Sequence, residues 1–354
     1  MNYPRVFKVR LTLVEPAIVS VRRTRTGFFI MESSVIPGTT ARGALLTYLY
    51  RLGRLTRADL ERISRKGLVR FTPMLLEGAK VITSFSFELK LKGEYRLMKL
   101  ETVKEVVRRA LEENSLKPLC DLFPKEISKT IQGVYTEKKP NVRLSIQVAI
   151  NKRERRAEEE MLFSYETVER GAKYEGYAID FAKVLTEGEY EVHIGLGRSR
   201  GLGGALLLVE EISASERVEK LLKQVREASF EVLGKNFVIL VARAPIVSLI
   251  GATRARPFIP KLGGSGWNAK IAKVKGKNLA FGKLRHIGGW SLLRGLPRPS
   301  IICADIGSLF VYEICGKDWD EGLARICAFG VDHLSSIGLN FLLPISSDEV
   351  VRRG

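Results

Sequence analysis

Apolar and polar side chains alternate along the first part of the chain. Over residues 6–18 apolar side chains recur with the period of a β-strand that buries one face. A second apolar segment, 28–35, leads into a Pro37-Gly38 turn, and residues 41–51 then follow helical spacing. We expect Thr39 or Thr40 to cap this helix.

Strands and helices continue to alternate along the rest of the chain. Both halves read β-α-β-β-α-β, and the second half restarts with a strand that resembles the opening one. This pattern predicts an α+β protein made of two tandem ferredoxin-like (RRM-like) domains with insertions. The other predicted strands are 81–91, 142–150, 161–168, 190–194, 205–209, 237–250, 308–314 and 333–345, and the other predicted helices are 103–113, 211–230 and 319–329.

The same pattern suggests the domain boundaries. We predict an N-terminal domain over 1–211, with an insertion around 89–140 and a glycine-rich loop at 195–204. Residues 212–234 are predicted to form a linking helix, and 235–354 a degenerate second domain. Within the first domain, the highly charged residues 151–160 separate two strands, so a protruding hairpin is expected. Its tip is either simply solvated or a finger that touches nucleic acid.

The charge of the chain indicates an anionic partner. It has 58 Lys and Arg against 39 Asp and Glu, a formal net charge of +19. Residues 1–58 hold ten Lys/Arg and two acids, and residues 232–304 hold thirteen Lys/Arg and no acid. Surfaces that are merely solvated usually mix both signs, so an acid-free run favours a nucleic-acid face. The basic surface of a thermophile's protein would explain the abundance of cations but not the missing acids.

Other classes of protein are disfavoured. The chain has no segment that resembles a signal peptide and no apolar run of about 18 residues, so a cytoplasmic protein without a membrane span is expected. Its four cysteines are scattered without a C-x-x-C pair, which argues against a disulfide framework or a zinc site. No cofactor is expected. A membrane-surface role is not excluded by charge alone, but no amphipathic basic helix stands out.

The richest motif is the glycine-rich loop at 195–204, between two predicted strands. Five glycines free its backbone, and Arg198 and Arg200 lie among them with no acid nearby in the sequence until Glu210. The loop matches neither the P-loop nor the dinucleotide-binding fingerprint. Guanidinium groups beside bare backbone suit phosphate oxygens, which predicts a loop that grips a polyanion. The alternative is a glycine-rich hairpin with no partner.

The start of the helix at 41–51 is a second candidate. Free N–H groups, threonine hydroxyls and Arg42 together suit an anion, although a capped core helix explains them equally well. Aromatic side chains that could stack on bases are Phe28, Phe29, Trp267 and Trp290, the two tryptophans being favoured by their glycine and Lys/Arg neighbours. The predicted RNA contacts are Arg22, Arg23, Arg25, Thr39, Thr40, Arg42, Gly195, Gly197, Arg198, Ser199, Arg200 and Gly201 in the first half, and Arg254, Arg256, Trp267, Lys270, Lys273, Arg285, Trp290 and Arg294 in the second.

Four blocks of the sequence resemble the CRISPR-associated RAMP superfamily. The segment 36–45, IPGTTARGAL, looks like the "IPGSS-x-RGAL" helix start, and 195–204 resembles the family's glycine-rich loop. The segment 144–166 resembles its central "I-D-R…LF-x-x-E" block. Residues 289–312 look like the closing region of double-domain subunits of type III effector complexes. The best match is a III-D-like subunit related to the family that holds the 5′ end of the guide.

The resemblance implies a non-catalytic subunit of an RNA-guided antiviral complex in a prokaryote. It would bind the 5′ handle of the CRISPR RNA, contact the large polymerase-like subunit and the first RAMP backbone subunit, and meet target RNA only indirectly. Related backbone subunits cleave target RNA with an aspartate just upstream of the helix start, where this chain has no Asp before Asp59. The alternative is a metal-independent endoribonuclease that processes CRISPR repeat RNA, with His193 or His286 as its acid or base.

Overall fold

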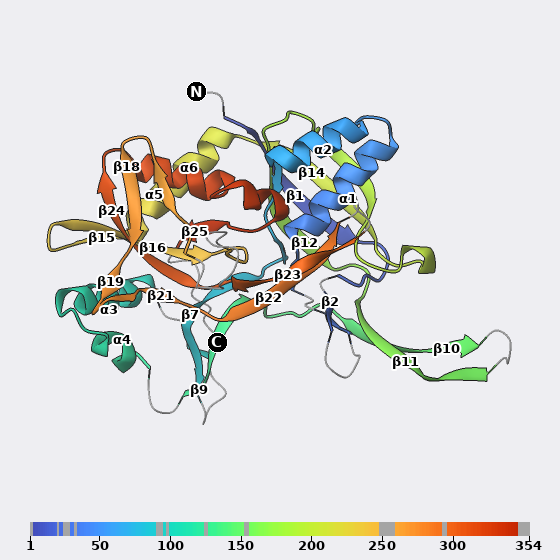
Figure 1. The fold of residues 1–354 in the computed structure, drawn as a ribbon, viewed down its shortest axis with the longest axis horizontal. Coiled ribbons are helices and arrows are strands. Elements are labelled where there is room, and N and C mark those ends of the chain that lie inside the picture. Colours follow the sequence, from blue (N-terminus) through green and yellow to red (C-terminus); the bar gives the residue numbers. More distant parts are fainter. Residues whose placement is uncertain are drawn as a thin grey trace. The chain divides into compact units, whose positions relative to one another are not determined.

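The computed structural model describes residues 3–19, 21–23, 29–31, 34–89, 95–96, 99–123, 127–151, 156–247, 259–291 and 296–345. The chain folds into two compact units. The N-terminal unit comprises Asn2–Ala79 and Thr136–Ile212, and the C-terminal unit comprises Lys80–Tyr135 and Ser213–Gly354. Helices and antiparallel sheets are mixed in both, which confirms the α+β class (Figure 1).

The N-terminal unit is built on a sheet with the strand order β13-β14-β1-β12-β6-β4, and β5 also pairs with β12. Its four central positions, β14-β1-β12-β5/β6, follow the 4-1-3-2 antiparallel order of a ferredoxin-like domain. The strands are β1 (Arg5–Leu13), β4 (Val35–Ile36), β5 (Val69–Phe71), β6 (Met74–Leu76), β12 (Lys173–Asp180), β13 (Gly188–His193) and β14 (Gly204–Ile212).

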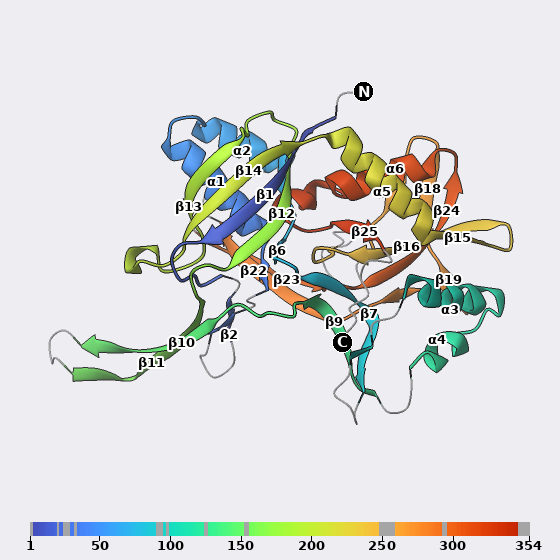
Figure 2. The ribbon, with the colours of Figure 1, turned by 180° about the vertical axis from the view of Figure 1, so that it is seen from behind.

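Two helices, α1 (Gly38–Arg51) and α2 (Arg57–Lys66), lie against one face of this sheet, and Figure 2 shows the other face. The alternation in β1 explains the division: Phe7, Val9 and Leu11 are fully buried, while Lys8 and Arg10 pair with acids of the neighbouring strands. The predicted alternation is therefore confirmed, although the strand ends at Leu13 and not at residue 18. Gly38 is required at the start of α1, since a Cβ there would lie 2.1 Å from the Phe71 carbonyl oxygen.

A long hairpin extends from the N-terminal unit, as the sequence predicts for the segment around 151–160 (Figure 1). Its strands belong to a small sheet of order β10-β11-β3-β2. They are β10 (Val142–Asn151) and β11 (Arg156–Val168), joined by β2 (Val21–Arg23) and β3 (Phe29–Met31).

The C-terminal unit repeats the ferredoxin-like order. β25 and β24 flank β16, and β18 pairs with the far side of β24, again 4-1-3-2. Helices α5 (Ala214–Ala228) and α6 (Trp319–Phe329) pack together, with an ion pair from Arg226 to Asp320 at 2.9 Å. The strands are β15 (Ser229–Val232), β16 (Lys235–Ala242), β17 (Leu262–Gly264), β18 (Trp267–Ile271), β19 (Lys273–Val274), β20 (Lys277–Asn278), β21 (Ala280–Phe281), β22 (Leu284–Ser291), β23 (Leu296–Ala304), β24 (Leu309–Gly316) and β25 (Leu342–Pro344).

The insertion between the two parts of the N-terminal unit belongs to the C-terminal unit. Gln132 Nε2 donates to the Ile306 carbonyl and to Ser308 Oγ, both at 3.0 Å, and the Ser84 N–H donates to the Gly307 carbonyl at 3.1 Å. These bonds tie the insertion to the start of β24. Its elements are β7 (Lys80–Leu89), β8 (Tyr95–Arg96), α3 (Leu100–Glu112), α4 (Lys117–Asp121) and β9 (Ile127–Tyr135).

The two halves share a detailed hydrogen-bond pattern. In the first half, the carbonyl of Gly204 accepts bonds from Val14 and Glu15, and the N–H of Gly203 donates to Pro16. In the second half, the carbonyl of Phe341 accepts from Arg243 and Ala244, and the N–H of Asn340 donates to Pro245. A short 3₁₀ helix precedes each junction: η1 (Arg198–Arg200) and η2 (His333–Ile337). The second half therefore has a counterpart of the glycine-rich loop at 335–341.

The hairpins repeat as well. Ala17 bridges Val168 at the end of β11, and Ile246 bridges Ala304 at the end of β23. The β22–β23 hairpin therefore occupies the place in the second half that β10–β11 occupies in the first.

Some elements differ from the prediction. A β-α-β-β-α-β domain has two helices. The N-terminal domain has the first of them, α1, but in place of the second it has β13 and η1 between β12 and β14. The C-terminal domain has the second, α6, but in place of the first no helix occurs among the described residues between β16 and β17. The last predicted strand, 333–345, is η2 followed by the short β25. The helix predicted as a linker, α5, packs on α6 within one unit.

Candidate nucleic-acid interface

The glycine-rich loop joins β13 to β14, as the sequence predicts. Four of its glycines, Gly195, Gly197, Gly201 and Gly203, have φ values of 73°, 87°, 71° and 87°. These are left-handed conformations, which residues with a Cβ rarely adopt. The backbone therefore makes several tight reversals around η1.

Most of these glycines are explained by packing. A Cβ at Gly195 would lie 2.0 Å from the Ile18 carbonyl oxygen, and one at Gly203 would lie 2.1 Å from the Ile194 carbonyl oxygen. The Leu196 N–H donates to Ile18 at 3.1 Å. Of the four, Gly201 alone faces open space, since a Cβ there would meet no atom within 4 Å. The glycines thus allow the loop to pack closely against the segment after β1, while its tip faces outward.

An acid does contact the loop, contrary to the expectation from the sequence. Glu15 follows β1, and its Oε2 accepts the Gly204 N–H at 2.9 Å. This carboxylate satisfies one of the backbone donors that the bare loop was expected to offer to phosphate. The cationic character of the loop therefore rests on its side chains.

Arg198, Ser199 and Arg200 form the exposed tip of the loop. The Arg200 guanidinium lies over the ring of Tyr165 in β11, 5.8 Å from its centroid. Such cation–π contacts restrain the position of an arginine side chain. Tyr165 was part of the family-like block in the sequence, but nothing in the sequence pairs it with Arg200.

The start of α1 is less suited to an anion than its sequence suggests. Its N-cap is Pro37, so neither Thr39 nor Thr40 caps the helix, and both are half-buried. Arg42 is only 7% exposed, and its Nη2 lies 3.5 Å from Ser64 Oγ of α2. The Arg42 side chain therefore packs between α1 and α2, and this favours the alternative of a core helix.

The predicted RNA contacts of the C-terminal unit differ in their exposure. Lys270 and Lys273 are exposed. Trp267 is 7% exposed and packed against glycines: a Cβ at Gly322 would lie 2.3 Å from its Nε1. The prediction that Trp267 offers a face to a base is therefore wrong; its glycine neighbours make room for the buried ring.

Two acids that follow the acid-free run in the sequence form ion pairs with its cations. Arg285 pairs with Asp305 at 3.6 Å, and Lys235 pairs with Glu313 at 2.9 Å. These acids lie after residue 304, so the run is partly neutralised in the fold.

For several predicted RNA contacts the structure describes the backbone without the side chain. These are Arg22 and Arg23 in β2, Phe29 in β3 and Trp290 in β22. The remaining such residues, Arg25, Phe28, Arg254, Arg256 and Arg294, lie outside the described residues altogether.

The two histidines of the ribonuclease alternative belong to different units. His193 ends β13 opposite Gly204, and His286 lies in β22; both are exposed. Among the described residues, no three His, Cys, Asp or Glu side chains gather in a way that would hold a metal ion. None of the described helices has the length and apolar character needed to cross a bilayer.

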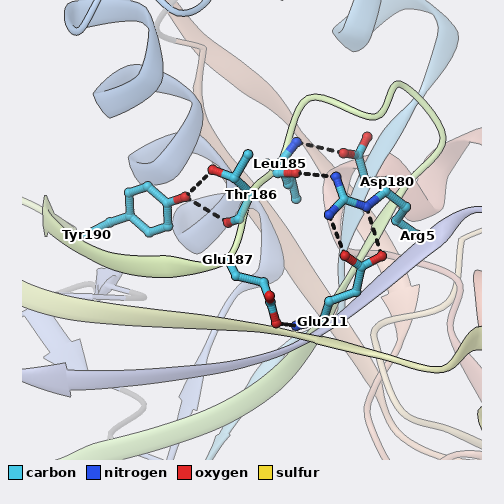
Figure 3. Close-up of polar contacts among 7 residues, drawn as sticks. All are labelled: Arg5, Asp180, Leu185, Thr186, Glu187, Tyr190 and Glu211. Atoms are coloured by element: carbon cyan, nitrogen blue, oxygen red, sulfur yellow. Dashed lines mark hydrogen bonds and ion pairs between the residues drawn. The ribbon is translucent and has the colours of Figure 1, made fainter.

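A polar network supports the loop-bearing strands from the other end (Figure 3). Arg5 in β1 donates through Nε to Glu211 Oε1 at 2.8 Å, with a second bond to Oε2, and through Nη1 to the Leu185 carbonyl at 2.8 Å. This pairing lowers the pKa of Glu211 below its usual value. The Leu185 N–H donates to Asp180 Oδ2 at 2.7 Å, but burial raises the pKa of Asp180 more strongly than such bonds lower it.

Comparison with known families settles the family. Residues 24–205 match the RAMP superfamily. The chain belongs to the RAMP superfamily. This RAMP protein has no match among the curated proteins.

Several solved structures are similar to this RAMP protein at low sequence identity. One is a chain of a type III-B Cmr-beta complex bound to cognate target RNA, with 16% identity, 86% of both chains covered and a TM-score of 0.42. A second is Cmr4 from Pyrococcus furiosus, with 13% identity, covering 59% of this chain and all of that one at a TM-score of 0.27. A third is a type IV-B CRISPR complex, with 13% identity, covering 58% and 90% at a TM-score of 0.28.

Proposed function

We propose that this RAMP protein is a non-catalytic subunit of a type III CRISPR effector complex that binds the CRISPR RNA. It grips the 5′ handle and guide backbone and contacts the large polymerase-like subunit and the first backbone subunit. One observation carries the proposal: Arg198, Ser199 and Arg200 are presented together at the tip of a loop whose backbone is fixed.

A fixed loop suits this role because little conformational entropy is lost when it binds. The backbone of the loop is bonded to the segment after β1 through Leu196 and Gly203. Its arginines offer planar guanidinium donors, which recognise phosphate oxygens with two parallel bonds. Binding through phosphates fixes position without reading sequence.

The proposed role has no chemical step, since the cationic tip orients RNA and needs no acid or base. His193 lies at the end of β13 that leads into the loop, so it is the residue that a cleavage activity would involve first. The experiment must therefore separate binding from cleavage.

The purified protein is incubated with labelled repeat-containing CRISPR RNA in EDTA, and the same reactions are analysed on native and denaturing gels. A shifted band with intact RNA is the expected result. Cleavage within the repeat in EDTA would contradict the proposal, and its loss in His193→Ala or His286→Ala would assign the ribonuclease alternative. Absence of any shift at salt near 0.1 M would also contradict it.

A further inference from the structure

A short hairpin in the C-terminal unit presents three lysines at its tip. β19 and β20 pair through Val274 and Lys277, and Lys275 and Gly276 form the two-residue turn between them. The side chains of Lys273, Lys275 and Lys277 are all exposed. Three positive charges are therefore carried by five consecutive residues.

The hairpin is held firmly from below. Val274 and Leu279 are fully buried, and the Leu279 N–H donates to the Ala272 carbonyl at 2.8 Å. The Lys275 N–H donates to Asn114 Oδ1, just after α3, at 2.9 Å. This bond fixes the turn itself, so the lysines project from a rigid base.

The turn keeps a lysine where its backbone is unfavourable. Lys275 has a φ of 48°, a conformation for which asparagine or glycine is the usual choice in a two-residue hairpin. Keeping a longer side chain in this conformation costs about 1 kcal/mol. Such strain is commonly retained where the side chain has a function.

Within the described part of the chain, these lysines are not paired with acids, unlike two other cations of the unit. Lys235 and Arg285 each pair with an acid, whereas no acid among the described residues pairs with Lys273, Lys275 or Lys277. Helix α3, which contacts this hairpin, ends at Glu112, and the following residue Glu113 is 3.6 Å from Arg109. The positive charge of the hairpin is thus left for an external anion.

We propose that the β19–β20 hairpin is a second phosphate contact, one that grips the backbone of the bound RNA independently of sequence. The inference rests on the proposed function and extends it to Lys275 and Lys277. Lys273 lies on β19, Lys275 in the turn and Lys277 on β20, so the three ammonium groups start from different parts of the hairpin and can meet separate phosphates. An acidic protein surface is the less favoured partner, because lysine is depleted in protein–protein interfaces and residues 271–281, all of which the structure describes, include no exposed aromatic side chain.

The test compares two double variants of the full chain. Lys275→Asn with Lys277→Gln removes two charges, and asparagine suits the left-handed turn. Lys220→Gln with Lys223→Gln removes two exposed charges from α5 and is the control. Binding of labelled oligo(U) is measured over a series of salt concentrations, after thermal unfolding has shown that neither variant is less stable than the native protein.

The hairpin variant should bind about tenfold more weakly near 0.1 M salt, and its plot of log affinity against log salt should lose about 1.4 in slope, while the control keeps the native slope. Equal slopes in all three proteins would overturn the inference. An unchanged slope with loss of co-purifying partner subunits would also overturn it and assign the hairpin to an acidic protein. The double variant Arg198→Ala with Arg200→Ala, measured on the same RNA, shows separately whether the proposed function itself fails.

Discussion

Single residues decide what each copy of the repeated junction does. In the first half, glycine at 203 lets the chain pass close to Ile194, and arginines occupy the exposed turn. In the second half, Asn340 takes the equivalent place, with a φ of 53° and a fully buried side chain. Its amide accepts from the Val247 N–H at 2.7 Å and donates to the Val247 carbonyl at 2.9 Å. The second junction is thus closed by a side chain and has a structural role.

Replacing Asn340 should therefore cost stability. Asn340→Ala leaves the buried N–H and carbonyl of Val247 without these partners, and we expect a loss of about 2–4 kcal/mol in the free energy of unfolding. Asn340→Gly, which accepts the positive φ without strain, should lose a similar amount if the hydrogen bonds are responsible. Urea unfolding measures both. Full recovery in the glycine variant would mean that backbone strain, and not hydrogen bonding, explains the alanine result.

Tyr165 is a second residue with a testable role, because its ring lies beside the Arg200 guanidinium. If its ring restrains Arg200, Tyr165→Leu should weaken RNA binding about two- to fivefold, the range of an exposed cation–π contact. Tyr165→Phe keeps the ring face and should bind like the native protein. Titration of labelled RNA into each variant measures this, and equal affinity of the leucine and phenylalanine variants would show that the ring does not matter.

At the scale of elements, contacts at both ends of strands β1 and β14 hold the glycine-rich loop in place. Glycines tie it to the segment after β1, and at the opposite end of the sheet the Arg5–Glu211 pair joins β1 to the end of β14 (Figure 3). Because Arg5 also bonds the Leu185 carbonyl, the segment between β12 and β13 is fixed by the same guanidinium.

The Glu211 pair predicts a dependence of stability on pH. The pKa of Glu211 is lowered by its bond to Arg5, so its contribution is present above the ordinary value of 4.5 and is lost as the pH falls through the lower pKa of the folded protein. The pair is partly exposed, so at pH 7 the free energy of unfolding of the native protein should be higher than that of Glu211→Gln by about 1 kcal/mol or less. Urea midpoints of both proteins across pH 3–7 test this. A difference that grows toward acid pH would contradict it.

At the scale of the whole molecule, some features of the fold and the site follow from local sequence, and others depend on contacts between distant residues. Local sequence patterns are sufficient for most of β1, for α6 and for the glycine loop, because each is a contiguous run of residues. The assignment of residues 80–135 to the C-terminal unit depends on contacts such as Gln132 with Ser308, which no local pattern reveals. Trp267 was misassigned for a similar reason: glycines that leave room for a buried ring and glycines that expose a backbone look alike in sequence.

The salt dependence of RNA binding by the arginine-loop variant tests the central claim most directly. Arg198→Ala with Arg200→Ala is compared with Arg57→Ala and Arg65→Ala, which removes two exposed arginines from α2 of the same unit. With repeat-containing CRISPR RNA, the loop variant should bind more weakly and lose about 1.4 in the slope of log affinity against log salt, while the α2 variant keeps the native slope. A native slope in the loop variant, or an equal loss in both, would contradict the claim that this loop grips the RNA backbone.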